Sequence, residues 1–368
     1  MGDHAPLIER AFNFTPREQS YAVEEVEGEV PAHVRGTYYI NGPSRFSRGP
    51  FRYRHWLDGD GMVCALRFEG GRAHFTSRFV RTAKLTAEEE AGRPLFRTFG
   101  TGFDGDRLKR GVMLETPANV SVYPYAGALL TFGEQGLPYE LDPLTLETRR
   151  TFNFRGALND VSPFAAHPKF DPSTGEAFNF GVAFSADQPC LNFYRFDAEA
   201  RLVFRRRLPL ERACSIHDFG LSQTCAVFYL SPYVLDVRAL GEGRTPSDAL
   251  RWEPERGSRL LVVSRETGEP RAVVSVGSFY CLHFINCFEE GGRLNVDVLE
   301  LERPVYDQYQ ELPDLFTDVR EGRPVRLVYT PSVALIPEPG SLGLVGVGLL
   351  LTFGRVTRRR RATRRGSY

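Results

Sequence analysis

Short runs of alternating apolar and polar residues, separated by turn residues, fill most of this chain between residues 1 and 330. Segments 57–80, 191–210 and 259–277 each hold two such runs around a turn containing glycine, proline or aspartate. A period of two places successive side chains on opposite faces of a strand. The sequence therefore predicts an all-β fold built from consecutive hairpins.

The spacing of the hairpins indicates how the sheets are arranged. They recur at roughly the 40–50 residues of a four-stranded propeller blade. A β-sandwich would show the same alternation and is the alternative. Helical periodicity is confined to short stretches at 84–92 and 307–320. A hydrophobic content of 42% and a charged content of 25% are ordinary for a globular protein.

Three histidines lie beside apolar, strand-like segments. They are His167 in AAHPKFDP, His217 in SIHDFGLS and His283 in LHFINCFE, and the gaps between them are 50 and 66 residues. A single histidine is more often structural, and these gaps exclude one local metal loop. They suit ligands that successive blades deliver to one central ion, which favours a propeller over a sandwich. Neutral imidazoles can bind Fe(II) and leave positions open for dioxygen.

A ligand histidine needs an acceptor for the N–H of its other ring nitrogen. Glu134, which follows an apolar strand in TFGEQGLPYEL, is the predicted acceptor. Two other acidic motifs have simpler interpretations. Asp58-Gly59-Asp60-Gly61 lacks the rest of an EF-hand loop and predicts a tight turn that enters a strand. Glu88-Glu89-Glu90 predicts a solvated helix face.

Charge separates the end of the chain from the rest. The chain has 46 basic and 46 acidic residues, but seven arginines lie within 355–368. The remaining 39 basic and 46 acidic residues give a net charge of −7. An acidic body without a basic stripe argues against nucleic acid as a partner. The absence of a clustered set of carboxylates argues against a calcium-dependent propeller hydrolase.

Six segments together resemble the carotenoid cleavage oxygenase family, which includes carotenoid, apocarotenoid and lignostilbene dioxygenases and the retinal pigment epithelium isomerohydrolase. They occur in family order and cover about residues 8–310: GTYYINGPSRF (36–46), LDGDGMVCALRF (57–68), PANVSVYPYAGALLTFGEQGLPYELDPLTLET (117–148), FAAHPKFDPSTGE (164–176), SIHDFGLSQTCAVF (215–228) and LHFINCFEE (282–290).

This resemblance implies a seven-bladed propeller with one non-haem Fe(II) on its axis, held by four histidines. His167, His217 and His283 match the first three ligands, and Glu134 matches a glutamate that hydrogen-bonds a ligand histidine. It implies no catalytic residue beyond the metal centre. The implied reaction uses O₂ to cleave a conjugated C=C bond of a carotenoid, apocarotenoid or stilbene-like substrate into two carbonyl products.

The resemblance fades after about residue 310, and no histidine follows His283. We therefore expect residues 1–330 to form a partial propeller of about four to five blades, without the fourth ligand. Residues 331–368 form a different, apolar and arginine-rich tail. Pro337-Glu338-Pro339, a short apolar run and an arginine cluster resemble a PEP-CTERM sorting signal. Translation in a different reading frame is the alternative.

Two functions follow from these expectations. The first is an iron-dependent dioxygenase. The second is a catalytically impaired, truncated remnant that binds an apolar ligand or has a structural role. The N-terminal segment MGDHAPLIERAFNF has no apolar region typical of a signal peptide. We expect a cytoplasmic protein, with peripheral membrane contact or anchoring through the tail as a further option.

Overall fold

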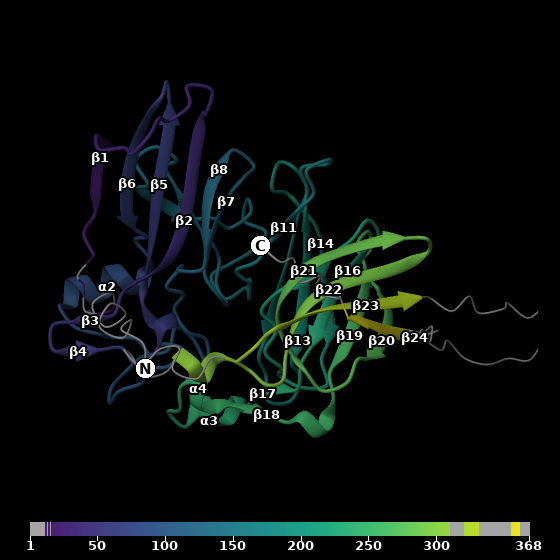
Figure 1. Ribbon diagram of the computed structural model, residues 1–368. Coiled ribbons are helices and arrows are strands. Elements are labelled where there is room, and N and C mark those ends of the chain that lie inside the picture. The colour runs from purple at the N-terminus through teal and green to yellow at the C-terminus, as the bar shows by residue number, and fades with distance from the viewer. Residues whose placement is uncertain (1–11, 13, 15, 310–319, 331–354, 361–368) are drawn as a thin grey trace, which may run out of the picture. The chain divides into compact units, whose positions relative to one another are not determined.

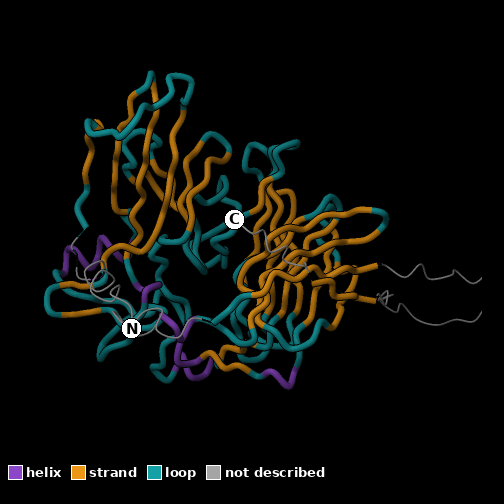
Figure 2. Tube along the Cα trace, in the orientation of Figure 1, coloured by secondary structure: helices purple, strands orange, loops and turns teal. Residues whose placement is uncertain are grey.

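The computed structural model describes residues 12, 14, 16–309, 320–330 and 355–360, and most of its regular structure is β-strand (Figures 1 and 2). Within this part of the chain, twenty strands form five four-stranded sheets. The predicted all-β fold is confirmed, and five sheets agree with the four to five blades expected. No described helix has the length and apolar character that a bilayer span requires.

The first compact unit comprises Met1–Ala213, Leu235–Leu250 and Val305–Val319. Its three antiparallel sheets have the strand orders β1-β6-β5-β2, β10-β9-β8-β7 and β11-β12-β13-β14. The strands are β1 (Gln19–Val23), β2 (Gly36–Arg45), β5 (Asp60–Glu69), β6 (Arg72–Phe79), β7 (Ser121–Tyr125), β8 (Ala128–Phe132), β9 (Tyr139–Leu141), β10 (Thr148–Thr151), β11 (Lys169–Phe170), β12 (Ala177–Ala183), β13 (Cys190–Phe196) and β14 (Leu202–Pro209).

The second compact unit comprises Cys214–Val234, Arg251–Pro304 and Arg320–Tyr368. Its two antiparallel sheets have the orders β15-β16-β19-β20 and β21-β22-β23-β24. The strands are β15 (Phe219–Leu221), β16 (Cys225–Leu230), β19 (Arg259–Ser264), β20 (Pro270–Ser275), β21 (Tyr280–Glu290), β22 (Arg293–Leu301), β23 (Arg323–Thr330) and β24 (Arg355–Arg360).

The remaining described elements are short. Two further strand pairs are β3 with β4 and β17 with β18. The bounds are β3 (Ser47–Arg48), β4 (Phe51–Arg52), β17 (Tyr233–Leu235), β18 (Leu250–Trp252), α2 (Ala83–Ala91), α3 (Val237–Gly241), α4 (Pro246–Ala249), η1 (Trp56–Asp58), η2 (Pro254–Arg256) and η3 (Tyr306–Tyr309).

Local sequence explains most of these elements. The three hairpins predicted at 57–80, 191–210 and 259–277 are β5–β6, β13–β14 and β19–β20. The predicted helix at 84–92 is α2, which begins after the capping residue Thr82 and ends at Gly92 in the left-handed region. Of the helix expected at 307–320, residues 306–309 form η3, and 310–319 lie outside the described residues.

Packing between sheets determines which strand faces are buried. In the second unit, Val227 and Val262 of one sheet and Val296 and Leu327 of the other belong to one buried cluster. In the first unit, Phe132 and Tyr194 connect the second and third sheets in the same way. Middle strands such as β12 and β16 are therefore buried on both faces, whereas the edge strand β20 alternates between exposed and buried residues.

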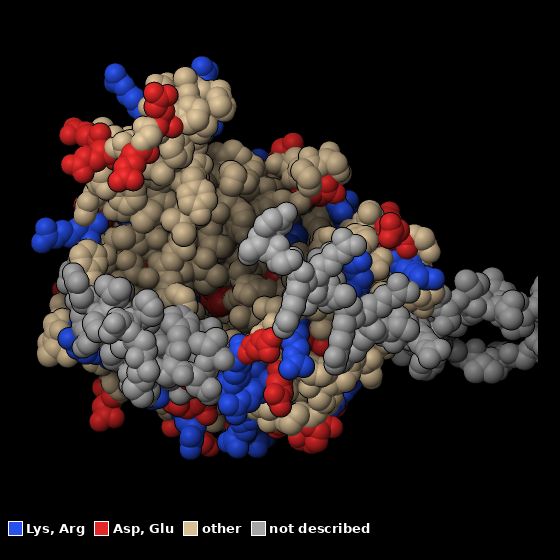
Figure 3. Space-filling view, viewed as in Figure 1, with Lys and Arg blue, Asp and Glu red and all other residues tan. Residues whose placement is uncertain are grey.

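The C-terminal tail contributes to the last sheet. Residues 355–360 form β24, which pairs antiparallel with β23 from Val325↔Arg360 to Thr330↔Arg355. Arginine-rich composition did not indicate this strand. The domain boundary at residue 330 stays a prediction, and of the proposed sorting segment, 331–368, residues 331–354 and 361–368 lie outside the described residues. On the face seen in Figure 3, basic side chains are interspersed with acidic ones.

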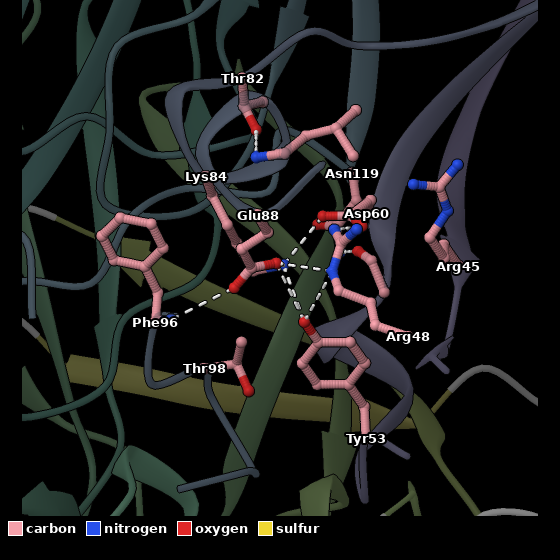
Figure 4. Close-up of polar contacts among 12 residues, drawn as sticks. Arg45, Arg48, Tyr53, Asp60, Thr82, Lys84, Glu88, Phe96, Thr98 and Asn119 are labelled. Atoms are coloured by element: carbon pink, nitrogen blue, oxygen red, sulfur yellow. Dashed lines mark hydrogen bonds and ion pairs between the residues drawn. The ribbon is translucent and has the colours of Figure 1, made fainter. Parts of the chain in front are cut away.

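Helix α2 carries a buried ion cluster around Glu88, while Glu89 and Glu90 lie on its exposed face as predicted. Lys84 and Glu88 are fully buried, and Lys84 Nζ lies 3.0 Å from Glu88 Oε2 and 2.9 Å from Asp60 Oδ1 (Figure 4). Arg48 Nε lies 2.8 Å from Glu88 Oε2 and also contacts Asp60. The prediction of a solvated face was therefore wrong for Glu88. Two cations and two carboxylates balance in charge, which makes their burial tolerable.

Glu88 also fixes the chain that follows α2. Its Oε1 accepts hydrogen bonds from the amides of Leu95 at 3.0 Å and Phe96 at 3.2 Å. Asp60 begins β5 directly after η1, as expected for the turn at Asp58-Gly59-Asp60-Gly61. The carboxylate pair of Asp60 and Glu88 thus ties α2 to the first sheet.

We predict that Glu88→Gln lowers the free energy of unfolding by about 3–5 kcal/mol, because it leaves Lys84 and Arg48 buried beside one carboxylate. Glu90→Gln, on the exposed face of the same helix, is the matched control and should change stability by less than about 0.5 kcal/mol. Urea denaturation at pH 7 measures both. Equal stability of the two variants would contradict a structural role for the cluster.

The stability difference between the native chain and Glu88→Gln should depend on pH. Burial raises the pKa of Glu88, but Lys84, the Leu95 amide and Arg48 together outweigh it and leave the pKa below its ordinary value of 4.5. The carboxylate therefore stabilises the fold above pH 4.5, and this contribution is lost as the pH falls through the lowered pKa. We expect the stability difference between the native chain and Glu88→Gln to shrink below pH 4.5. A constant difference would contradict this account.

Candidate metal centre

Two of the predicted ligands meet in the second unit. His217 lies two residues before β15, and His283 lies within β21. Their ring centroids are 4.9 Å apart with an interplanar angle of 84°, and one ring nitrogen of each lies within 4.8 Å of the other. Both side chains are half-buried. Two imidazoles in this edge-on arrangement can turn toward one cation.

The strand that carries His283 is irregular at that position. In the pairing of β21 with β22 the register shifts between Cys281 and Phe284 and again between Phe284 and Asn286. Irregularities of this kind are frequent next to functional sites, where they redirect a side chain that a regular strand would hold differently. His283 lies within the first of these shifts, and the two shifts flank its neighbour Phe284, so the side chains here depart from the strand's alternation.

Gly220 permits β15 to approach β21 closely. A Cβ at this position would lie 2.9 Å from Cys287 Cβ and 2.9 Å from Phe284 Cδ1. Cys287 Cβ is fixed to the backbone of β21, so a larger residue would push the strands apart. Because His217 precedes β15 and His283 lies on β21, Gly220 sets how near the two histidines lie.

The buried carboxylate of Asp218 lies close to His283. Asp218 is only 4% exposed. Its Oδ1 accepts a hydrogen bond from the Phe219 amide at 2.8 Å, and its Oδ2 accepts one from the Phe284 amide at 3.0 Å. The distance from Oδ2 to His283 Nδ1 is 3.7 Å. The sequence shows Asp218 only as the neighbour of His217, because Phe284 is 66 residues away.

The Cys281 thiol, close to His283, is poorly suited to compete as a ligand. Cys281 Sγ donates to the carbonyl oxygen of His283 at 3.5 Å. Burial, followed by the negative charges of Asp218 and Glu300, raises the pKa of the Cys281 thiol well above its ordinary value. Since metals bind the thiolate, the imidazoles are the better donors at neutral pH.

The other two predicted site residues lie in the first unit. His167 stands between Ala166 and β11, is half-buried, and follows a segment with fixed backbone. There the Ala165 amide donates to Phe180 O at 2.7 Å, and the Asn179 side chain donates to Ala165 O at 2.9 Å. Two hydrogen bonds to adjacent residues of β12 therefore hold the backbone that leads to His167.

Glu134 lies in the loop between β8 and β9, and two glycines hold this loop against Thr116. A Cβ at Gly133 would lie 2.2 Å from Thr116 Oγ1, and one at Gly136 would lie 2.8 Å from Thr116 Cγ2. The half-buried Glu134 is thus placed by tightly packed backbone. Its role as acceptor for a ligand histidine stays a prediction.

Comparison with known proteins agrees with the motifs. The family described as retinal pigment epithelial membrane protein matches residues 12–330. The chain belongs to the carotenoid cleavage oxygenase family. The resemblance predicted from six segments is thereby confirmed over most of the chain.

Individual relatives of this family give the extent of similarity. The chain is 33% identical over 280 residues to isoeugenol monooxygenase of Pseudomonas nitroreducens, covering 76% of this chain and 57% of the relative. It is 30% identical over 333 residues to apocarotenoid-15,15'-oxygenase of Synechocystis, covering 84% and 63%. The chain thus spans about 57–63% of the length of these two relatives.

A solved structure from the same family supports the fold. Cobalt-substituted Synechocystis ACO superposes with a TM-score of 0.79 at 29% identity, covering 88% of this chain and 70% of that one. The propeller-type arrangement expected for this oxygenase family is therefore the fold of the chain.

We predict that Gly220→Ala destabilises the protein by about 1–3 kcal/mol, because β15 and β21 must separate to admit the methyl group. Gly42→Ala is the matched control in strand β2, since a Cβ there meets nothing within 4 Å. Urea denaturation of both variants tests this. Gly220→Ala as stable as Gly42→Ala would show that the close approach does not constrain the strands.

Proposed function

We propose that this protein is a non-haem Fe(II)-dependent dioxygenase. It would use O₂ to cleave one conjugated C=C bond of a carotenoid, apocarotenoid or stilbene-like substrate into two carbonyl products. The observation that carries this proposal is the half-buried pair His217 and His283, held at 4.9 Å between ring centroids, in a chain of the carotenoid cleavage oxygenase family. Because the chain spans only part of its relatives, the activity is proposed for it and not transferred from them.

The proposed ligands are His167, His217 and His283, each with one ring nitrogen to offer. Neutral imidazole is a suitable donor for Fe(II). Three protein ligands would leave coordination positions open for dioxygen. Glu134 would accept the N–H of one ligand ring and hold that ring's orientation. When bound, iron would supply the binding and activation of dioxygen.

The protein's own residues would position the reacting partners. His217 and His283 are half-buried and so keep part of each side chain exposed, and Phe284, the chain neighbour of His283, packs against the apolar cluster of the second unit. Insertion of both oxygen atoms of O₂ across one C=C bond balances the reaction without a proton donor or further reductant. No acid–base residue is therefore required of this chain.

We infer the substrate class only from the chemistry that the substrates named for the relatives share. Isoeugenol and apocarotenoids both contain C=C bonds in conjugation, and the chain is similar to enzymes named for each. We propose a conjugated apolar substrate and a cytoplasmic location, with membrane contact through residues 331–368 as the further option. Fractionation with and without that segment separates the two locations.

We predict about one Fe(II) per chain after anaerobic loading, and its loss in His217→Ala, because the variant removes one imidazole donor. His33→Ala, an exposed histidine outside the site, is the matched control and should retain the iron. Metal analysis of the purified protein gives the stoichiometry. Full iron content in His217→Ala would overturn the proposed site.

We predict that the iron-loaded chain converts an apocarotenoid or a hydroxystilbene to aldehyde products in the presence of O₂. Loss of the substrate's absorbance and mass spectrometry of the products measure the reaction. Iron binding without any cleavage would contradict the enzymatic function. It would favour the alternative of an impaired, apolar-ligand-binding or structural propeller.

A further inference from the structure

We propose that Asp218 is a positioning residue that fixes the spacing of His217 and His283 through the backbone. This inference rests on the proposed metal centre, and it assigns to the chain a carboxylate that the sequence did not single out. It depends on contacts within the second unit alone.

Asp218 links two sheets at the two points where the histidines are attached. One carboxylate oxygen accepts from the Phe219 amide at the start of β15, and the other accepts from the Phe284 amide in β21. Phe284 directly follows His283, and Asp218 itself directly follows His217. A single rigid carboxylate therefore connects the backbone of one histidine to the backbone of the other.

Burial makes this link strong. With Asp218 only 4% exposed, water competes little for its oxygens. Hydrogen bonds to a charged acceptor are about twice as strong as neutral ones. Release of either amide would leave a buried N–H and a buried carboxylate oxygen without this partner, which is costly. The two hydrogen bonds of Asp218 thus oppose any change in the spacing of β15 and β21.

At His283 the hydrogen bond of Asp218 goes to the backbone of the following residue, Phe284. The 3.7 Å between Asp218 Oδ2 and His283 Nδ1 exceeds the range of a hydrogen bond. The register of β21 against β22 shifts on both sides of Phe284, which interrupts the regular ladder there. The Phe284 amide, within this irregular stretch, is held by Asp218 instead. Asp218 therefore supplies the restraint that the bulged strand lacks.

Co(II) is the probe for this role, because its visible absorption reports ligand geometry and requires no turnover. Asp218→Asn retains one acceptor oxygen, but its amide nitrogen would face a backbone N–H, so one of the two strands loses its tie. We expect Co(II) binding weakened about 10–100-fold and an altered visible spectrum.

Asp297→Asn is the matched control. It removes a buried carboxylate of the same unit, which lies on β22 opposite Asn286 and pairs with Arg326 at 2.6 Å. It should change stability but leave Co(II) affinity and spectrum as in the native chain. Urea denaturation first establishes that each variant is folded. If Asp218→Asn does not fold, Asp218→Ser, which can still accept from the Phe219 amide, takes its place with the same expected loss.

The outcomes separate this inference from the proposed function. A native chain that binds no Co(II) overturns the metal centre itself. A native chain that binds Co(II), together with an Asp218 variant of unchanged affinity and spectrum, overturns only the positioning role. Weakened binding with an altered spectrum in the Asp218 variant, and neither change in Asp297→Asn, supports it.

Discussion

The packing of one sheet against the next is the constraint on which this structure depends. A four-stranded sheet whose middle strands are apolar on both faces cannot bury them alone. Val227 and Val262 are covered by Val296 and Leu327 of the adjoining sheet, and Phe132 and Tyr194 play the same part in the first unit. Full burial of such side chains contributes about 1.5–3 kcal/mol each. Sheet stacking therefore stabilises the fold and, in the second unit, also positions the segments that carry His217 and His283.

The local elements could be predicted because their causes are local. Alternation and turn residues identified hairpins such as β5–β6, where Gly70 and Gly71 adopt the positive φ that the turn requires. The burial of Glu88 could not be predicted in this way. Its partners Asp60 and Arg48 come from other segments, and a run of three glutamates gives no sign of them. Likewise, β24 is arginine-rich, and its pairing depends on the free edge of β23.

The candidate site also has features that the sequence predicts and features that depend on tertiary contacts. The settings of His217 and His283 were recognisable in the sequence, since each histidine adjoins an apolar strand. The contribution of Asp218 was not, because it depends on an amide 66 residues away and on the register of β21. Gly220 is similar: its importance comes from Cys287 and Phe284, which only the packed sheets bring near. Residue type predicts donors, whereas tertiary register decides how donors are held.

The Asp218 link has a consequence for how the second unit unfolds. One carboxylate bonds to backbone in both of its sheets, so separating either sheet from the other must break a buried, charge-assisted hydrogen bond. The two sheets are thereby coupled, and a cation held by both histidines would add a second bridge at the same point. Ligands that bind only the folded state stabilise it by an amount that grows with the logarithm of the ratio of their concentration to their dissociation constant. Metal supply would then raise the free energy of unfolding of the second unit in addition to supporting its chemistry.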